Sequence, residues 1–368
     1  MAQIHPGGRK FLDNPGGIVI RLGIVGCNYG RTVLLPAFRT DARCEVVALA
    51  GTDAARAAQL AREAGVPKSF GDWRALVEDK TVDAVAIATP PRQQAAIAVR
   101  ALELGKPVFA EKPMAATLAS AEAMLKQACI ARKPAVIDFE FPELLSWQRA
   151  KAMLDDGAIG TLRHVVVTWN VENATTRARL RSWKTQGDDG GGVLGNFVSH
   201  CFHYLEWFCG PIATLSARVF GLPGDPGFEA TVALAFTFAS GAGGSLTMSS
   251  ASYLGSGHRI EFYGEDGSLF LINAGSDYTR GFELTAARRS TGKPERIEII
   301  DPDEYKYADG RIAPVSRLAR RFLDAIEEKD QASPGFAEGF RVQQLIDAAR
   351  RSHNTRRLVE TPVKESVT

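Results

Sequence analysis

The turn Gly26-Cys27-Asn28-Tyr29-Gly30 carries the first chemical signal in the sequence. It lies where a short apolar run gives way to a stretch over 30–39 that can be helical despite Pro36. Glycine turns between a strand and a helix present backbone N–H groups and the helix N-terminus to a pyrophosphate, so this turn predicts a bound dinucleotide. The usual G-x-G-x-x-G spacing is not met, because Asn28 occupies the second glycine position and Gly30 falls one residue before the third. An ordinary tight turn of an α/β protein is the alternative.

A second pattern concerns the ribose of such a nucleotide. The next strand-like run ends in Ala50-Gly51-Thr52-Asp53. An acidic residue in line with this strand end would take the ribose 2′-hydroxyl of NAD and exclude a 2′-phosphate. Gly51 stands there instead, with Thr52 and Arg56 nearby, so NAD(P) is predicted with a slight preference for NADP. Asp53 could equally be the N-cap of the following helix.

Composition limits the function classes. Lys plus Arg number 44 and Asp plus Glu 42, giving a net charge of +2, which is too balanced for a protein that follows nucleic acid phosphates. No apolar run approaches the roughly 18 residues that cross a bilayer. The five cysteines are widely spaced and contain no C-x-x-C pair, so a reducing, cytoplasmic location without disulfides is expected. We therefore expect neither a nucleic acid nor a membrane partner, but a small-molecule substrate.

The elements that must position these residues divide the 368-residue chain into two domains. Strands and helices alternate up to Phe141, which predicts an α/β doubly wound parallel sheet, a Rossmann domain. Beyond it, strand-like runs separated by glycine-rich turns predict an α+β domain with an open, mostly antiparallel sheet, followed by two terminal helices. We expect a flexible arm at 1–17, the dinucleotide-binding domain at 18–141, and a substrate-binding and oligomerisation domain at 142–368. An open sheet face is a natural pairing surface, so a homodimer or homotetramer is expected.

Motifs further along the chain resemble those of the Gfo/Idh/MocA oxidoreductases, the glucose-fructose oxidoreductase and inositol dehydrogenase family. One is Thr89-Pro90-Pro91, followed by the run Gly105 to Pro113 with its Glu111-Lys112-Pro113 triplet. Another is Gly190-Gly191-Gly192-Val193-Leu194-Gly195-Asn196 leading to His200. Ala158-Ile159-Gly160 and Trp183 also fit, and the resemblance runs from about Arg21 to Val359.

The resemblance implies hydride transfer between nicotinamide and a carbinol carbon of a sugar, cyclitol or related polyol. Lys112 would hydrogen-bond the reacting oxygen, and His200 would relay the proton as general acid and base, with Asn196 beside it. Trp183 and His203 are expected at the substrate. The residues expected at the cofactor are Gly26, Asn28, Tyr29, Gly30, Gly51, Thr52, Arg56, Thr89, Pro90, Glu111 and Lys112.

Four positions depart from the family pattern. Asn28 replaces a glycine, Gln94 stands where a histidine usually follows Thr-Pro-Pro, Asn196 replaces an aspartate, and His203 replaces a common aspartate. An amide at 196 can orient His200 but cannot stabilise an imidazolium by charge, so the proton relay is weakened or rerouted. In a helix, Asn196, His200 and His203 would share one face, but without a carboxylate there we expect no metal site.

Two alternatives stay open. A redox-neutral enzyme could hold NAD(P) tightly on the same scaffold, or the chain could be a non-catalytic nucleotide-binding homologue. The basic residues around Trp183 form either a lid that meets an anionic group or a solvated loop face. They are Arg177, Arg179, Arg181 and Lys184.

Overall fold

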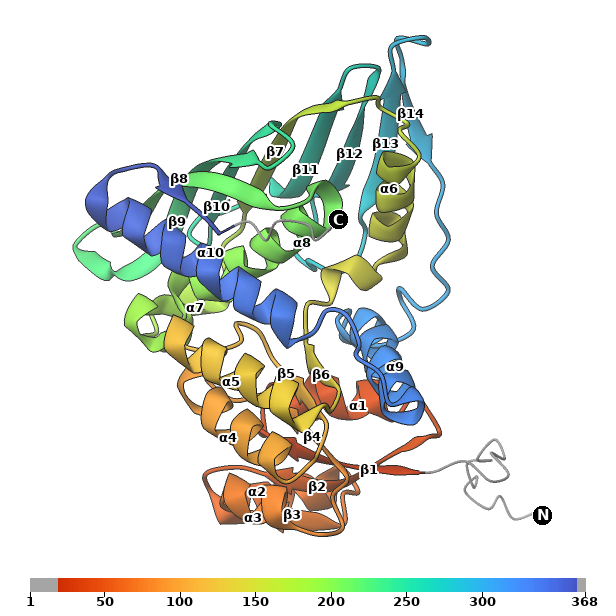
Figure 1. Cartoon of the computed structure of the whole chain (residues 1–368), viewed down its shortest axis with the longest axis vertical. Coiled ribbons are helices and arrows are strands. Elements are labelled where there is room, and N and C mark those ends of the chain that lie inside the picture. The colour runs from red at the N-terminus through yellow and green to blue at the C-terminus, as the bar shows by residue number, and fades with distance from the viewer. Residues whose placement is uncertain (1–18, 363–368) are drawn as a thin grey trace, which may run out of the picture.

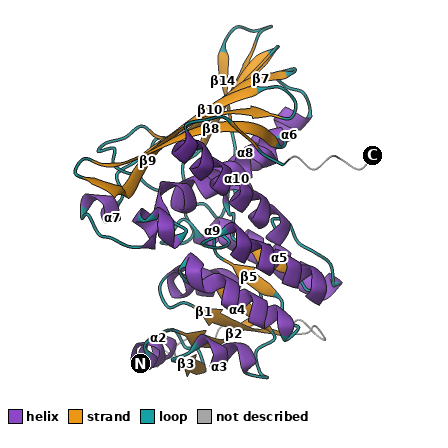
Figure 2. Ribbon diagram, turned by 60° about the vertical axis from the view of Figure 1, so that its left-hand side comes forward, coloured by secondary structure: helices purple, strands orange, loops and turns teal. Residues whose placement is uncertain are grey.

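The computed structural model describes residues 19–362, which form two sheets at opposite ends of the molecule with several helices between them (Figures 1 and 2). The predicted arm, 1–17, lies outside the described residues.

The first sheet has six parallel strands in the order β3-β2-β1-β4-β5-β6. Its strands are β1 (Ile20–Val25), β2 (Cys44–Ala50), β3 (Lys68–Phe70), β4 (Ala84–Ile87), β5 (Val108–Ala110) and β6 (Ala135–Ile137). The strand order reverses between β1 and β4, and in open α/β sheets this reversal leaves a crevice at the carboxyl ends of the strands. The predicted Rossmann-like sheet is confirmed.

The helices that join these strands begin at polar side chains that accept hydrogen bonds from the first turn. Asp53 accepts from the Arg56 N–H at 3.0 Å, and Thr117 accepts from the Ser120 N–H at 3.1 Å. The helices are α2 (Ala54–Glu63), α3 (Trp73–Glu78), α4 (Pro91–Glu103) and α5 (Leu118–Ala131). Strand β3 was not predicted, because its three residues are only half-buried and form no apolar run.

The first helical segment leaves the glycine turn directly. It begins as a π-helix over Gly30–Leu34 and continues as α1 (Leu35–Phe38). The N–H and the hydroxyl of Thr32 both donate to the carbonyl of Asn28, at 3.0 and 3.2 Å. The helix predicted over 30–39 is therefore present, with a wider first turn than a regular α-helix.

The second sheet has nine strands in the order β14-β13-β12-β11-β7-β10-β9-β8-β15. Only the β7–β10 pair is parallel, so the predicted mostly antiparallel sheet is confirmed. The short strands β14 and β15 were not predicted, because most of their residues face solvent; nor was β13. The strands are β7 (Leu162–Asn170), β8 (Ile212–Leu222), β9 (Asp225–Phe238), β10 (Gly243–Ser249), β11 (Gly257–Gly264), β12 (Gly267–Asn273), β13 (Glu283–Arg288), β14 (Pro294–Ile297) and β15 (Val359–Glu360).

Helices cover one face of this sheet. α6 (Leu145–Asp155), α8 (Ser199–Cys209) and α10 (Phe336–Thr355) lie on that face, and Figure 2 shows no helix on the other. On the bare face, β9 exposes Ala233, Ala235 and Thr237, which alternate with buried residues.

Helix α9 (Ile312–Glu328) returns to the first sheet, although it belongs by sequence to the second half of the chain (Figure 1). The Phe322 ring packs edge-to-face on Phe38 and Phe109, with ring centroids 6.2 and 5.8 Å apart. Part of the predicted 142–368 domain therefore completes the core of the Rossmann sheet.

Helix α4 is fastened to the segment that follows β5 by one buried side chain. The Gln94 amide donates to the carbonyls of Glu111 and Pro113, both at 2.8 Å. We predict that Gln94→Leu lowers the free energy of unfolding by about 1–3 kcal/mol, because it keeps the side-chain volume but leaves both carbonyls unpaired. Urea denaturation measures this. The neighbouring exposed Gln93→Leu is the control, and equal losses in both variants would contradict the assignment.

Candidate active site

The glycine turn follows β1 and packs tightly against the end of β4. Gly26 has φ +121°, and a Cβ there would lie 2.2 Å from the Ala88 carbonyl oxygen, so no other residue fits without moving the backbone. The Gly26 N–H donates to the Ala50 carbonyl at 2.9 Å, which joins the ends of β1 and β2. At Gly30 a Cβ would meet the Ile24 side chain at 2.7 Å. Because these two glycines carry no Cβ, the ends of β1, β2 and β4 can pack closely together.

Two adjoining cavities open at this edge of the sheet. The first, which we name the strand-end cavity, measures about 490 Å³ and is lined by Gly26, Asn28, Gly51, Thr52 and Asp53 among others. The second, the lysine cleft, measures about 440 Å³ and includes Lys112 and Trp183. Their walls share Cys27, Asn28, Arg56, Ala88, Thr89 and Pro90. The two cavities therefore form one continuous groove.

Lys112 enters the lysine cleft from the end of β5. Its backbone is held on both sides, since the Glu111 N–H donates to Ile87 at 2.9 Å and Gln94 binds the carbonyls of Glu111 and Pro113. Its ammonium group donates to the backbone carbonyl of Asn196 at 3.0 Å. Lys112 thus ties the first sheet to the segment before α8 while it faces the groove.

Three buried carboxyl groups lie around Lys112. Glu111 and Glu140 line the cleft, and Asp138 accepts a hydrogen bond from the Tyr29 hydroxyl at 3.2 Å. Burial raises the pKa of Glu111, and burial together with the charges of Glu111 and Glu140 raises the pKa of Asp138 well above its usual value. Burial raises the pKa of Glu140 to about 7, although the Lys112 charge acts in the opposite direction. The pKa values of all three carboxyls therefore lie above those of exposed carboxyls.

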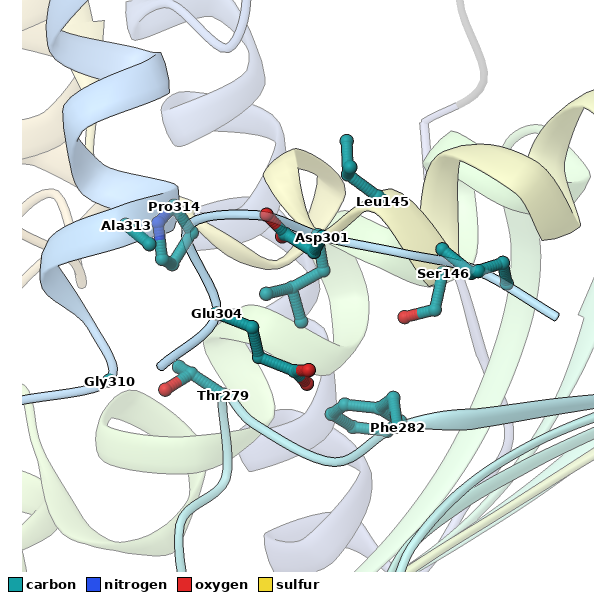
Figure 3. Close-up of a pocket in the computed structure, with 11 residues that line it drawn as sticks. Leu145, Ser146, Thr279, Phe282, Asp301, Glu304, Gly310, Ala313 and Pro314 are labelled. Atoms are coloured by element: carbon teal, nitrogen blue, oxygen red, sulfur yellow. The ribbon is translucent and has the colours of Figure 1, made fainter. Parts of the chain in front are cut away.

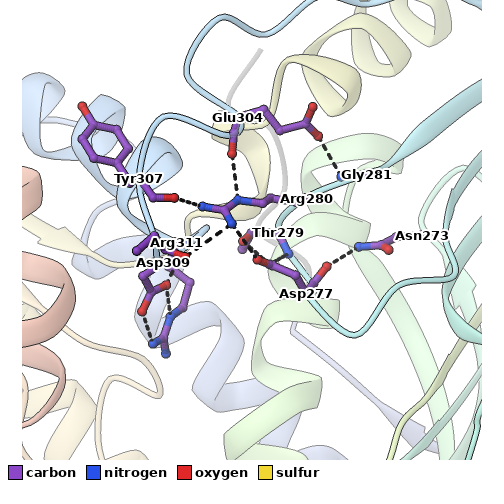
Figure 4. A network of polar contacts seen from close by, with 10 residues as sticks. Asn273, Asp277, Thr279, Arg280, Gly281, Glu304, Tyr307, Asp309 and Arg311 are labelled. Carbon is purple, nitrogen blue, oxygen red and sulfur yellow. Dashed lines mark hydrogen bonds and ion pairs between the residues drawn. The ribbon is translucent and has the colours of Figure 1, made fainter.

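Two further residues, Tyr278 and Arg311, line the cleft. Arg311 belongs to a network of polar contacts between loops (Figure 4). Arg311 is held by Asp309, with contacts of 2.9 and 2.6 Å, and its guanidinium lies over the Tyr29 ring at 5.1 Å. Arg280 donates to the carbonyls of Glu304 and Tyr307 and so fixes the loop that carries Tyr278.

Beside this network lies a cavity of about 50 Å³, lined by Ser146, Asp301 and Glu304 among others (Figure 3). It holds a few water molecules at most, so it is not a site for a sugar or a nucleotide.

The two histidines lie outside the cleft. His200 is buried, its Nδ1 lies 3.7 Å from a Glu140 carboxylate oxygen, and this nitrogen has no hydrogen-bond partner among residues 19–362. Burial, with the Lys112 charge, lowers the pKa of His200 well below its usual value. His203 stacks on Phe139 at 4.3 Å and borders a separate pocket near Trp207, so it cannot contact a substrate in the cleft. Burial lowers the pKa of His203 to about 3.

The predicted shared face of Asn196, His200 and His203 is not formed. Leu194–Val198 is a π-helix, and its wider turn changes the angle between Asn196 and the α-helical residues after it. Asn196 lines the cleft, whereas His200 approaches it only through Glu140. Within the described residues no group of three or more His, Cys, Asp or Glu could hold a metal ion.

The glycine-rich segment before α8 packs Trp183 against the cleft. A Cβ at Gly191 would lie 1.7 Å from the Trp183 carbonyl oxygen. Arg350 from α10 pairs with Glu229 at 2.8 Å and donates to the Gly191 carbonyl at 3.2 Å. From α4, Arg92 pairs with Asp189 at 2.6 Å and so joins the first sheet to this segment.

The four basic residues around Trp183 lie in different surroundings. Lys184 lines the cleft, whereas Arg181 pairs with Asp225 at 2.5 Å, and Arg177 and Arg179 are exposed. Of these four residues, Lys184 alone lines the cleft, and its contact with an anionic group stays a prediction.

Sequence reasoning did not assign several cleft residues, among them Glu140, Tyr278 and Arg311, and it named Lys184 only within a basic cluster. Glu140 had a usable signal, because Asp138 and Glu140 follow the last apolar strand of the first sheet, at the edge where sites form. Tyr278 and Arg311 stand in irregular loops and have none. Of the predicted cofactor residues, only Gly30 lines neither cavity.

Comparison with known proteins agrees with this geometry. A model described as an oxidoreductase family with an NAD-binding Rossmann fold matches residues 20–139, and one for the GFO/IDH/MocA C-terminal domain matches residues 147–270. An uncharacterised oxidoreductase of Synechocystis sp. is 29% identical over 361 residues, covering 93% of this chain and 96% of that protein. Levoglucosan dehydrogenase of Pseudarthrobacter phenanthrenivorans is 26% identical over 348 residues, covering 84% of this chain and 85% of that protein.

Among solved structures, levoglucosan dehydrogenase in complex with NADH and levoglucosan has the same fold, with a TM-score of 0.83 at 24% identity, covering 94% of this chain and all of that one. The two family models match this chain in the order of the two sheets. The chain therefore belongs to the Gfo/Idh/MocA family of NAD-binding oxidoreductases.

Proposed function

We propose that this protein is an NAD(P)-dependent oxidoreductase that transfers a hydride between nicotinamide and a hydroxyl or keto carbon of a sugar, cyclitol or related polyol. The observation that carries the proposal is the continuous groove, with a tight glycine turn in one part and Lys112 beside buried carboxyls in the other. The relative that acts on levoglucosan supports a sugar-like substrate.

The strand-end cavity fits a dinucleotide. The Gly26 backbone leaves no room for a Cβ, so a pyrophosphate can approach the turn closely, and Asn28, Thr89 and Pro90 line both cavities. Gly51, Thr52 and Arg56 would surround the ribose. Bound nicotinamide would supply the ring carbon that accepts or gives the hydride.

Lys112 would donate a hydrogen bond to the reacting substrate oxygen and stabilise its negative charge as it forms. Trp183 and Asn196 would line the sugar-binding side of the same cleft. His200 does not line the cleft and lies behind Glu140, at 3.7 Å from its carboxylate. We do not assign His203 to the substrate site, because it lines a different pocket.

The location and assembly of the protein are also proposals. No helix in residues 19–362 is long and apolar enough to cross a membrane. We propose a cytoplasmic homodimer or homotetramer paired through the bare face of the second sheet, where small side chains of β9 leave room for close contact.

The test of function is Lys112→Met. We expect kcat/KM to fall about 10²–10⁴-fold on a polyol that the wild type oxidises, because the donor to the reacting oxygen is lost. NADH binding, followed by fluorescence, should persist. Lys126→Met, at an exposed position of α5, is the control. Unchanged turnover in Lys112→Met would refute the role of Lys112.

Cofactor choice is tested at the ribose. Asp53→Asn keeps a helix cap but removes a negative charge from the strand-end cavity, so we expect affinity for NADPH relative to NADH to rise about tenfold. Arg56→Gln should shift the ratio the other way. Titration of both variants with NADH and NADPH measures the ratio of the two affinities. An unchanged ratio in both variants would mean that other residues bind the ribose 2′-position.

Assembly is tested by light scattering. We expect wild-type protein to have the mass of a dimer or tetramer and Ala235→Arg to dissociate it, because the new charge lies on the bare face. Ala119→Arg, exposed on α5, should not. A wild-type monomer would rule out the pairing.

A redox-neutral reaction is the second candidate, because Asn196 provides no carboxylate for His200. Cofactor retained through purification, with turnover but no net change in the absorbance of reduced nicotinamide, would favour it over the first.

A further inference from the structure

We propose that Glu140 is the residue that exchanges a proton with the substrate oxygen, in place of a histidine–aspartate pair. This inference rests on the proposed function, since it assigns the acid and base of that same site.

Position favours Glu140 over the neighbouring histidine. Glu140 lines the lysine cleft beside Lys112, whereas His200 does not line it and stands behind Glu140, at 3.7 Å from its carboxylate. A general base must lie within hydrogen-bond reach of the proton that it takes. Of the two, only Glu140 is placed to reach a ligand in the cleft.

The groups around Glu140 keep its two protonation states close in free energy. Its side chain is 2% exposed, so burial disfavours the carboxylate, while the charges of Lys112 and Arg311 favour it and that of Glu111 opposes it. The result is a pKa of about 7, where one group can act as base in oxidation and as acid in reduction. Titratable groups from several elements face Glu140. In the first half they are Tyr29 in the glycine turn, Glu111 and Lys112 after β5, and Asp138 after β6. In the second half they are His200 in α8, Tyr278 in the β12–β13 loop and Arg311 at the start of α9.

The chemistry balances as follows. In the oxidation direction the substrate O–H bond breaks, its proton goes to a Glu140 oxygen, and the oxygen electrons form the C=O bond. The C–H bond at the same carbon would break as well, and its hydrogen and electron pair would pass to oxidised nicotinamide when that cofactor is bound. Lys112 keeps its proton throughout and stabilises the oxygen. Glu140 then returns its proton to solvent through the groove.

A second pair of carboxyls lies next to Glu140. Tyr29 donates to one oxygen of Asp138 at 3.2 Å, and Asp138 and Glu111 share a side-chain hydrogen bond, which requires a proton on one of them. The charge of Glu140 raises the pKa of Asp138, because like charges in a buried site oppose each other. The protonation of Glu140 is therefore coupled to that of Asp138.

The first test needs no substrate. Infrared spectra of cofactor-free protein, recorded across a pH titration, should show a protonated carboxyl band that is lost near pH 7 in the wild type. In Glu140→Gln this change should be missing. Retention of the full change in Glu140→Gln would overturn the assignment of the titrating carboxyl.

The second test follows oxidation kinetics. In the wild type, kcat/KM should rise with pH and level off above about 7, since the carboxylate is the reactive form. Glu140→Gln should lose this rise and fall about 10²–10⁴-fold in rate, while Glu140→Asp should restore part of the rate with a displaced midpoint. His200→Gln should keep the rise. A variant pair in which His200→Gln loses the rise and Glu140→Gln keeps it would overturn the proposal.

NADH binding distinguishes the role of Glu140 from the proposed oxidoreductase function. Glu140→Gln should bind NADH as the wild type does, because Glu140 lines the lysine cleft and not the strand-end cavity. Wild-type protein that neither binds the cofactor nor oxidises any polyol would refute the proposed function, and the infrared titration would still decide whether Glu140 titrates.

Discussion

The contact between the Gly26 backbone and the Ala88 carbonyl is the constraint on which the groove depends. It closes the ends of β1 and β4 at the place where the strand order of the first sheet reverses. Any side chain at position 26 would force those ends apart, because the position where its Cβ would stand is only 2.2 Å from the carbonyl oxygen. Apart from Arg56 of α2, the residues that line both cavities directly follow these same strand ends. The strand-end cavity and the lysine cleft are therefore positioned by one close approach of backbone to backbone.

Burial affects the protonation of the groups in the site as much as ion pairing does. The Lys112 charge acts to lower the pKa of Glu111 and Glu140, but among residues 19–362 neither carboxylate forms a salt bridge with it, and its ammonium group donates to the Asn196 carbonyl. Arg311 is already satisfied by Asp309 and acts over a longer range. This differs from a structural ion-pair network, in which every charge has a neutralising partner. Perturbed carboxyls that line a groove are more typical of sites for proton transfer.

The sequence predicted the parts of the molecule whose signals are local. Apolar strands, Asp53 as a helix cap, and the glycine turn all act within a few residues, and each predicted element of the first sheet is present. Strand-like runs separated by glycine-rich turns predicted the second domain, and the family motifs pointed to Lys112. Residues that depend on long-range packing could not be found this way. Tyr278 and Arg311 reach the cleft because Arg280 ties one loop to another, and His200 turns away because a π-helix precedes it.

The return of α9 to the first sheet limits how the two halves can move. The chain passes between the sheets at 138–144, at 298–311 and again at 329–335, and Phe322 is buried between Phe38 and Phe109 of the first half. α9 is therefore part of the first half in space, and any movement between the halves must bend the chain at three connections together, not at a single hinge. The segment that carries Asp189 and Gly191 adds two contacts between elements, to Arg92 of α4 and to Arg350 of α10.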